Sequence, residues 1–319
     1  MRSPRVYLVL FLYLIIHSPF AYSEQDSIDT AAPDWAMPAP LAYRSMILDV
    51  TQAGSRQVAV GERGHILYSD DCGGNWQQAK VPTRTTLTAV FFIDDKRGWA
   101  VGHDSVVLKT GDGGENWRIT YQDAPAEQPL FDIWFRNSRQ GIAIGAYGAF
   151  IISNDGGETW QSSPVSDEDF HLYSITPFAD DNLLIAGEAG SLYRSTDAGR
   201  SWQKLVRPYV GSFFGVLSLS RSSLLVYGMR GHVFRSDDGG DSWKQVDVGV
   251  NSSLEGGYRQ PGGNIYLAGH NGVILKSTNQ GNSFSPIQAG NRRNYAALSA
   301  CSNGDLIVVG ESGVEKLTP

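Results

Sequence analysis

Apolar residues occur along the chain in short runs separated by polar, glycine-containing segments. Residues 87–121 show the pattern clearly, with β-branched and aromatic residues concentrated at 87–93, 98–102, 106–110 and 117–121. Runs of this length between turn residues are typical of antiparallel strands joined by tight hairpins. The stretch therefore predicts a unit of four short strands, with the first innermost and the fourth outermost.

A short motif that ends in an aromatic residue marks the same point in successive units. Its six copies occupy residues 69–76, 110–117, 153–160, 195–202, 236–243 and 277–284. Their last residues, which are 41, 43, 42, 41 and 41 positions apart, are Trp76, Trp117, Trp160, Trp202, Trp243 and Phe284. A steady period of this length is typical of the four-stranded blades of a β-propeller.

A second marker, Gly-x-x-Gly, keeps the same period and predicts seven blades. It begins at residues 61, 145, 187, 228, 269 and 310, and at residue 102 the pair has lost its second glycine. Glycine accepts the positive φ of a tight hairpin, so we place these pairs between the second and third strands. The aromatic-ending motifs then form the hairpins between the third and fourth strands.

The seventh unit, residues 294–319, ends where its motif and outer strand should begin. Trp35 and the residues after it resemble the segment that follows Trp76. We therefore expect an all-β, seven-bladed β-propeller of four-stranded blades, with the ring closed by the N-terminal strand. The alternative is that Trp35 belongs to a disordered leader.

The motif residues suit a folded turn. Aspartate accepts hydrogen bonds from nearby main-chain N–H groups, glycine adopts a left-handed conformation, and tryptophan packs into the blade. Calcium binding would need a distal bidentate glutamate, which the copies lack, so we expect no metal and no cofactor. The residues assigned to turn or core are Asp71, Trp76, Asp112, Trp117, Asp155, Trp160, Asp197, Trp202, Asp238, Trp243 and Trp35.

The first residues have the pattern of a secretory signal peptide. Arg2 and Arg5 precede an apolar run at 6–16, which is short for a membrane anchor, and no cysteine follows that could carry a lipid. We expect a signal peptide at 1–23, a leader at 24–32 and a single propeller domain at 33–319. The protein would then be exported to a periplasm, or to a thylakoid lumen in a photosynthetic source.

Charge and cysteine content narrow the class of partner. The formal net charge of −7 argues against nucleic acid or an anionic membrane as the main partner. We expect a monomer that binds protein and has no stable membrane insertion. Cys72 and Cys301 are the two cysteines, and the sequence leaves open whether they pair or remain separate thiols.

The motifs are Asp-box, or BNR, repeats, and the chain resembles the propeller family of photosystem II stability and assembly factors. The resemblance rests on Gly-x-x-Gly pairs that lead directly into Asp boxes, as in residues 61–76, 145–160, 187–202 and 228–243. It implies a non-catalytic, exported scaffold that helps to assemble a membrane protein complex. Single Asp boxes also occur in secreted glycosidases, so the box alone has low specificity.

In a propeller, the Gly-x-x-Gly hairpins and the loops between blades emerge on one face, opposite the Asp boxes. Arginine and tyrosine on that face would form a protein-binding surface, because both residue types are favoured at interfaces. Related assembly factors also use an arginine-lined face. The candidate partner-binding residues are Arg44, Arg63, Arg84, Arg207, Tyr209, Arg230, Arg292 and Arg293.

The residues of this face are also compatible with two other kinds of site. A sialidase-like glycosidase could use Tyr147 and Glu188 with the arginines, but the chain lacks the Arg-Ile-Pro motif of sialidases, so we expect no catalytic residues. Four histidines lie in or beside the Gly-x-x-Gly hairpins without the close spacing of metal ligands. These histidines, expected to be structural or solvated, are His65, His103, His232 and His270.

Overall fold

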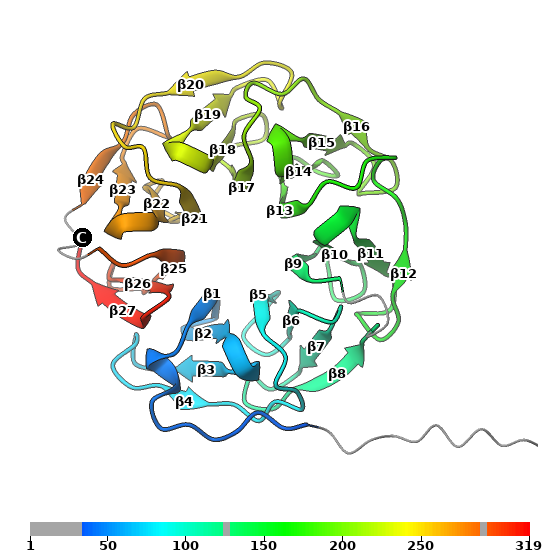
Figure 1. The fold of residues 1–319 in the computed structure, drawn as a ribbon, viewed down its shortest axis with the longest axis vertical. Coiled ribbons are helices and arrows are strands. Elements are labelled where there is room, and N and C mark those ends of the chain that lie inside the picture. The colour runs from blue at the N-terminus through cyan, green and yellow to red at the C-terminus, as the bar shows by residue number, and fades with distance from the viewer. Residues whose placement is uncertain (1–33, 124–127, 288–291) are drawn as a thin grey trace, which may run out of the picture. The chain divides into compact units, whose positions relative to one another are not determined.

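The described part of the chain forms seven antiparallel sheets arranged around a common axis (Figure 1). The structure is a computed structural model, and it describes residues 34–123, 128–287 and 292–319. The prediction of an all-β, seven-bladed propeller is confirmed. The predicted signal peptide and leader lie outside the described residues. No helix among the residues described is long and apolar enough to cross a membrane.

Six blades contain four strands each, and the seventh contains three. The first four blades consist of β1 (Ile47–Ala53), β2 (Arg56–Gly61), β3 (Ile66–Ser69) and β4 (Gln77–Gln78); β5 (Leu87–Phe92), β6 (Gly98–Gly102), β7 (Val107–Thr110) and β8 (Arg118–Tyr121); β9 (Leu130–Phe135), β10 (Gly141–Gly145), β11 (Phe150–Ser153) and β12 (Gln161–Ser162); and β13 (Leu172–Pro177), β14 (Leu183–Gly187), β15 (Leu192–Ser195) and β16 (Gln203–Lys204).

The remaining blades follow the same order from the channel outward. They consist of β17 (Phe213–Ser218), β18 (Leu224–Gly228), β19 (Val233–Ser236) and β20 (Lys244–Val246); β21 (Leu254–Arg259), β22 (Ile265–Gly269), β23 (Ile274–Ser277) and β24 (Ser285–Ile287); and β25 (Tyr295–Ala300), β26 (Leu306–Gly310) and β27 (Gly313–Leu317). Short 3-10 turns are η1 (Ala42–Arg44), η2 (Glu62–Gly64), η3 (Ala146–Gly148), η4 (Glu188–Gly190), η5 (Met229–Gly231) and η6 (His270–Gly272).

The core lies between neighbouring blades. Every residue of β6, β10, β14, β18, β22 and β26 is buried, because other blades cover both faces of these second strands. One apolar cluster joins Val58 and Val60 of the first blade to Leu87 and Val90 of the second. Burial of apolar surface at each such contact stabilises the ring by about 25 cal/mol per Å².

The two glycines of each Gly-x-x-Gly pair have different roles. A Cβ on Gly61 would lie 2.2 Å from the carbonyl oxygen of Met46, so the inner strand leaves no room for a side chain. Gly64 has a φ of +69°, and a Cβ there would lie 2.0 Å from the carbonyl oxygen of Thr83, in the loop to the next blade. The first glycine thus packs within its own blade, and the second packs against the chain leading to the next.

Each Asp box forms a turn whose aromatic residue packs against the preceding blade. In the third box, the Ser153 hydroxyl donates to Asp155 (2.9 Å), and the amides of Glu158 and Thr159 donate to the same carboxylate (3.0 Å each). Trp160 packs edge-on against Phe135, with ring centroids 5.8 Å apart, in a cluster that includes Trp99 of the second blade. The box therefore joins a local turn to an interblade contact.

The ring does not close through an N-terminal strand, so that prediction was wrong. Among the described residues, the seventh sheet ends at β27, and the chain around Trp35 instead follows the outer edge of the first blade (Figure 1). The Ala36 amide donates to the Val81 carbonyl (2.9 Å). Trp35 is 51% exposed and is not a core residue. The segment that begins at Trp35 resembles the segment after Trp76 in sequence, but it packs at the outer edge of the first blade and does not join the seventh.

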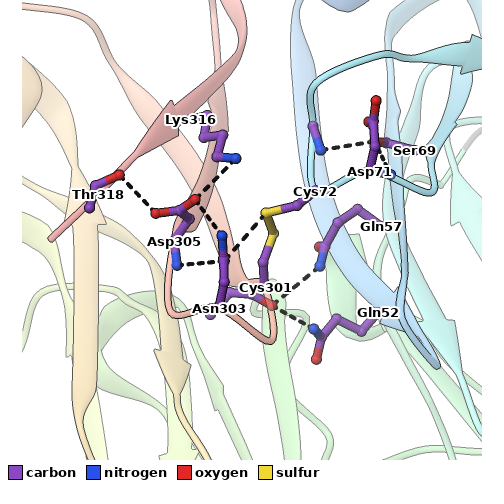
Figure 2. The surroundings of a disulfide bond; sticks show 12 residues. Gln52, Gln57, Ser69, Asp71, Cys72, Cys301, Asn303, Asp305, Lys316 and Thr318 are labelled. Atoms are coloured by element: carbon purple, nitrogen blue, oxygen red, sulfur yellow. Dashed lines mark hydrogen bonds and ion pairs between the residues drawn. A yellow bond between two sulfur atoms is a disulfide. The ribbon is translucent and has the colours of Figure 1, made fainter.

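Closure comes from contacts between the first and seventh blades. Cys72, in the first Asp box, forms a disulfide with Cys301, which follows β25, and the two Cα atoms are 5.8 Å apart (Figure 2). The side-chain amides of Gln52 and Gln57 both donate to the carbonyl oxygen of Ala300. The question that the sequence left open is thus answered in favour of a disulfide, which joins residues 229 positions apart.

Candidate functional site

The loops between blades and the Gly-x-x-Gly hairpins lie against one another, and they define the face that we call the rim face. Gly64 contacts Arg84, and Gly190 contacts Arg207 and the Tyr209 backbone. The Gly272 amide donates to the Arg293 carbonyl (2.6 Å). These contacts place the candidate arginines on one face, although they come from different blades.

The arginines fall into three groups around this face rather than into one cluster. The first and second blades carry Arg44, Arg63 and Arg84, the fourth and fifth carry Arg207 and Arg230, and the loop before the seventh carries Arg292 and Arg293. Tyr209 stacks on His232, with ring centroids 4.0 Å apart and planes inclined by 12°. The sequence predicted the shared face but could not show how these groups are spaced.

Several of these arginines already bind parts of the fold. Arg84 forms an ion pair with Asp34 (3.0 Å) and donates to the Trp35 carbonyl, while Arg207 donates to the Ala189 carbonyl (2.9 Å). Arg293 lies 3.3 Å from a carboxylate oxygen of Glu315. Their side chains therefore help to hold the loops of the rim face together.

Arg63 and Arg230 differ from the others because they stand at hairpin tips. Both are exposed, both have a φ of 57°, and neither forms an ion pair with any residue that the structure describes. Each tip is held in place by the glycine that follows it. Arg44 and Arg292 are also exposed, but Arg63 and Arg230 are the members of the predicted set that stand at hairpin tips with a left-handed backbone.

The mouth of the central channel adds a feature that sequence reasoning missed. A cavity of about 490 Å³ opens there. Its lining includes the second residue of each inner strand, namely Leu48, Thr88, Phe131, Tyr173, Phe214, Glu255 and Ala296. The sequence repeat does contain this information, because the seven residues occupy equivalent positions in their blades. It becomes visible only when the inner strands are aligned by blade.

Two carboxylates lie deeper in the channel, one residue further along β1 and β9. Asp49 accepts hydrogen bonds from the amides of Val50 and Val90, and Asp132 accepts from those of Ile133 and Ile175, all at 2.8 Å. Each carboxylate thus links its inner strand to the inner strand of the next blade. Their depth in the protein raises the pKa of Asp49 to about 6 and that of Asp132 to about 7, although both residues are only half-buried.

We expect the protein to lose stability as the pH rises from about 5 to 8. Between the unfolded pKa near 4 and these raised values, the folded state holds protons that the unfolded state has released, so the unfolding free energy falls with pH. The change should be on the order of 1–2 kcal/mol, because both residues are partly exposed and solvent screens their charges. Urea titrations at both pH values test this. Asp132→Asn should flatten the dependence, and an unchanged slope would contradict the assignment.

The residues of the glycosidase alternative lie beside His171. Tyr147 packs edge-on against its ring, with centroids 4.8 Å apart, and Glu188 accepts a hydrogen bond from the His171 amide (3.2 Å). Within the described ranges, neither side chain pairs with an arginine. The arrangement therefore differs from the tyrosine, glutamate and arginine cluster that a sialidase mechanism needs.

The four histidines of the hairpins do not come together. His65 is buried, His232 stacks on Tyr209, and His270 lies 3.2 Å from a carboxylate oxygen of Glu255. No group of three or more histidine, cysteine, aspartate or glutamate side chains in the described part of the chain could hold a metal ion. Of these four histidines, His270 contributes to the lining of the channel mouth.

Comparison with known proteins identifies similar sequences. The family model described as photosynthesis system II assembly factor YCF48 matches residues 68–127 and 119–251, which together cover more than half of the chain. The photosystem II assembly lipoprotein Ycf48 of Prochlorococcus marinus is 39% identical over 148 residues, which is 46% of this chain and 43% of that protein. The photosystem II assembly protein Ycf48 of Thermosynechococcus vestitus is 36% identical over 137 residues, or 43% of this chain and 41% of that protein. The matches thus span less than half of each relative.

Solved structures share the fold at lower sequence identity. A structure described as YCF48 bound to D1 peptide has a TM-score of 0.71 and 18% identity, covering 92% of this chain and 96% of the other. Streptogramin B lyase has a TM-score of 0.76 and 14% identity, covering 88% and 95% of the two chains. Because an assembly factor and a lyase both have this architecture, the fold alone does not determine function.

Proposed function

Because the chain belongs to the family of photosynthesis system II assembly factor YCF48, we propose that it is a non-catalytic scaffold that binds a polypeptide segment on its rim face. The partner would be a subunit of a membrane-associated complex, held during assembly. The relatives are named as assembly factors, and one solved structure of the fold is described as bound to a D1 peptide. The observation in this chain that carries the proposal is that Arg63 and Arg230 are exposed at hairpin tips of the rim face, on which the channel cavity also opens.

The proposal includes export. The disulfide between Cys72 and Cys301 is the kind of bond that persists in oxidising compartments such as the periplasm. Together with the pattern of the first residues, it supports a signal peptide that is removed and a propeller domain over 33–319 that acts outside the cytoplasm.

We expect the double variant Arg63→Asn and Arg230→Asn to bind a synthetic D1 peptide at least about tenfold more weakly than the parent protein, as measured by calorimetry. Asparagine suits both positions, because Asn271 already occupies the equivalent place in η6 with a φ of 59°. The replacement therefore removes charge while keeping the hairpin.

The matched control is Arg200→Asn, which removes an exposed arginine from the fourth Asp box, on the opposite face. It should leave peptide affinity unchanged. Equal losses from both variants would mean that net charge, and not the rim face, determines binding. Hydrolysis of a sialoside by the pure protein, lost on Glu188→Ala, would replace the scaffold proposal with an enzyme.

A further inference from the structure

The channel mouth has two unlike sides. Phe131, Tyr173 and Phe214 stand on three consecutive blades, with ring centroids 5.6 Å and 5.4 Å apart in turn, and form a continuous aromatic arc. The equivalent positions on the other blades carry smaller or acidic residues, Leu48, Thr88, Glu255 and Ala296. The cavity of about 490 Å³ is open because only three of the seven positions carry a ring.

The side formed by the sixth and seventh blades, next to the arc, is acidic. Glu255 is three-quarters covered, with 27% of its side chain exposed, and its one ion-pair partner among the residues described is His270, at 3.2 Å. Burial raises the pKa of Glu255, and the nearby His270 opposes this shift. Glu311 also lines the cavity and accepts hydrogen bonds from the backbone and side-chain amides of Asn294. Among the residues that the structure describes, no lysine or arginine lines this cavity.

We infer that the mouth binds an apolar side chain of the partner polypeptide, and that the neighbouring residue of that polypeptide is a lysine or arginine. This inference rests on the proposed function. The apolar side chain packs against Phe131, Tyr173 and Phe214, and the cation pairs with Glu255. The aromatic arc supplies apolar contact, and a partly buried carboxylate favours a cation that replaces lost hydration. Charge complementarity selects a basic segment for the acidic mouth. Arg63 and Arg230 lie outside the cavity lining, and they would bind acidic partner residues that flank this basic segment.

The test compares three short peptides that differ only at their centre, with Leu-Lys, Ala-Lys or Leu-Glu between acidic flanks. Fluorescence anisotropy should show that the Leu-Lys peptide binds the protein roughly tenfold more tightly than either of the others. Ala296→Trp fills the cavity and should abolish this preference. Glu255→Gln should remove the preference for Lys over Glu but keep that for Leu over Ala.

Met37→Trp is the matched control, because it adds the same side chain at the outer edge of the first blade, at a position that is 61% exposed and outside both the cavity and the rim face. Its affinity for the Leu-Lys peptide should equal that of the parent. Equal binding by Ala296→Trp and Met37→Trp, or equal binding of all three peptides, would overturn the inference. If the Arg63→Asn and Arg230→Asn variant still binds the D1 peptide more weakly in that case, the proposed function stands without the cavity at the channel mouth. If this variant binds the D1 peptide as the parent does, both the inference and the proposed function are wrong.

Discussion

Replacing Trp160 with alanine is expected to lower the free energy of unfolding by about 3–5 kcal/mol, the usual cost of removing a large buried aromatic side chain. Trp160 is 8% exposed, packs edge-on against Phe135, and donates through its indole nitrogen to the Gly157 carbonyl (3.3 Å). The cavity left behind would lie between the second and third blades, whose residues share one apolar cluster with Trp160. Denaturant titration followed by circular dichroism measures the loss.

Trp35→Ala is the matched control for this prediction. Trp35 is 51% exposed and lies at the outer edge of the first blade, so its removal should cost less than about 1 kcal/mol. If the two variants lost equal stability, the Asp-box tryptophan would not be a specific interblade contact. A large loss from Trp35→Ala alone would restore the discarded idea that this residue completes the ring.

Removing the disulfide should have an effect of similar size. We expect the variant Cys72→Ala, Cys301→Ala to be less stable by about 2–5 kcal/mol, because the bond closes a loop of 229 residues and limits the freedom of the unfolded chain. It also joins the first and seventh blades, which are not consecutive in the chain. Urea titration of the oxidised protein and of the variant gives the difference.

Reductant supplies the control for the disulfide. It should destabilise the parent protein by about the same amount and leave the double alanine variant unchanged. Equal stability of the oxidised and reduced parent would show that the Gln52 and Gln57 contacts to the Ala300 carbonyl hold the ring closed without the covalent bond.

The repeated features of this fold were predictable because their chemistry is local. Gly61 and Gly64 are required by contacts within one hairpin and its nearest neighbour, so the complete glycine pair recurs in six of the seven blades. The box turn around Asp155 is built from residues within a few positions of one another. The spacing of the Asp boxes and the number of Gly-x-x-Gly markers then predicted seven blades.

The closure of the ring could not be read in the same way, because it depends on which surfaces meet after folding. Trp35 resembles a strand that follows an Asp box, yet its neighbour Ala36 binds Val81 of the first blade. Whether Cys72 meets Cys301 also depends on how the first and last blades approach each other. Both outcomes follow from long-range packing, which the local pattern does not encode.

The candidate site was predicted in part for a related reason. Loop position placed Arg63 and Arg230 on the correct side of the blades, since topology alone decides that. The aromatic arc was missed because Phe131, Tyr173 and Phe214 each look like an ordinary strand residue within their own repeat. Only the radial arrangement brings them within contact distance.

Hydrogen exchange of the protein with and without a D1 peptide tests the central claim most directly. The account predicts slower exchange in η2, η5 and the starts of β9, β13 and β17, with no change in the six Asp boxes. Protection confined to the Asp boxes, or no protection at a peptide concentration that saturates Ycf48, would contradict the assignment of the rim face as the binding surface.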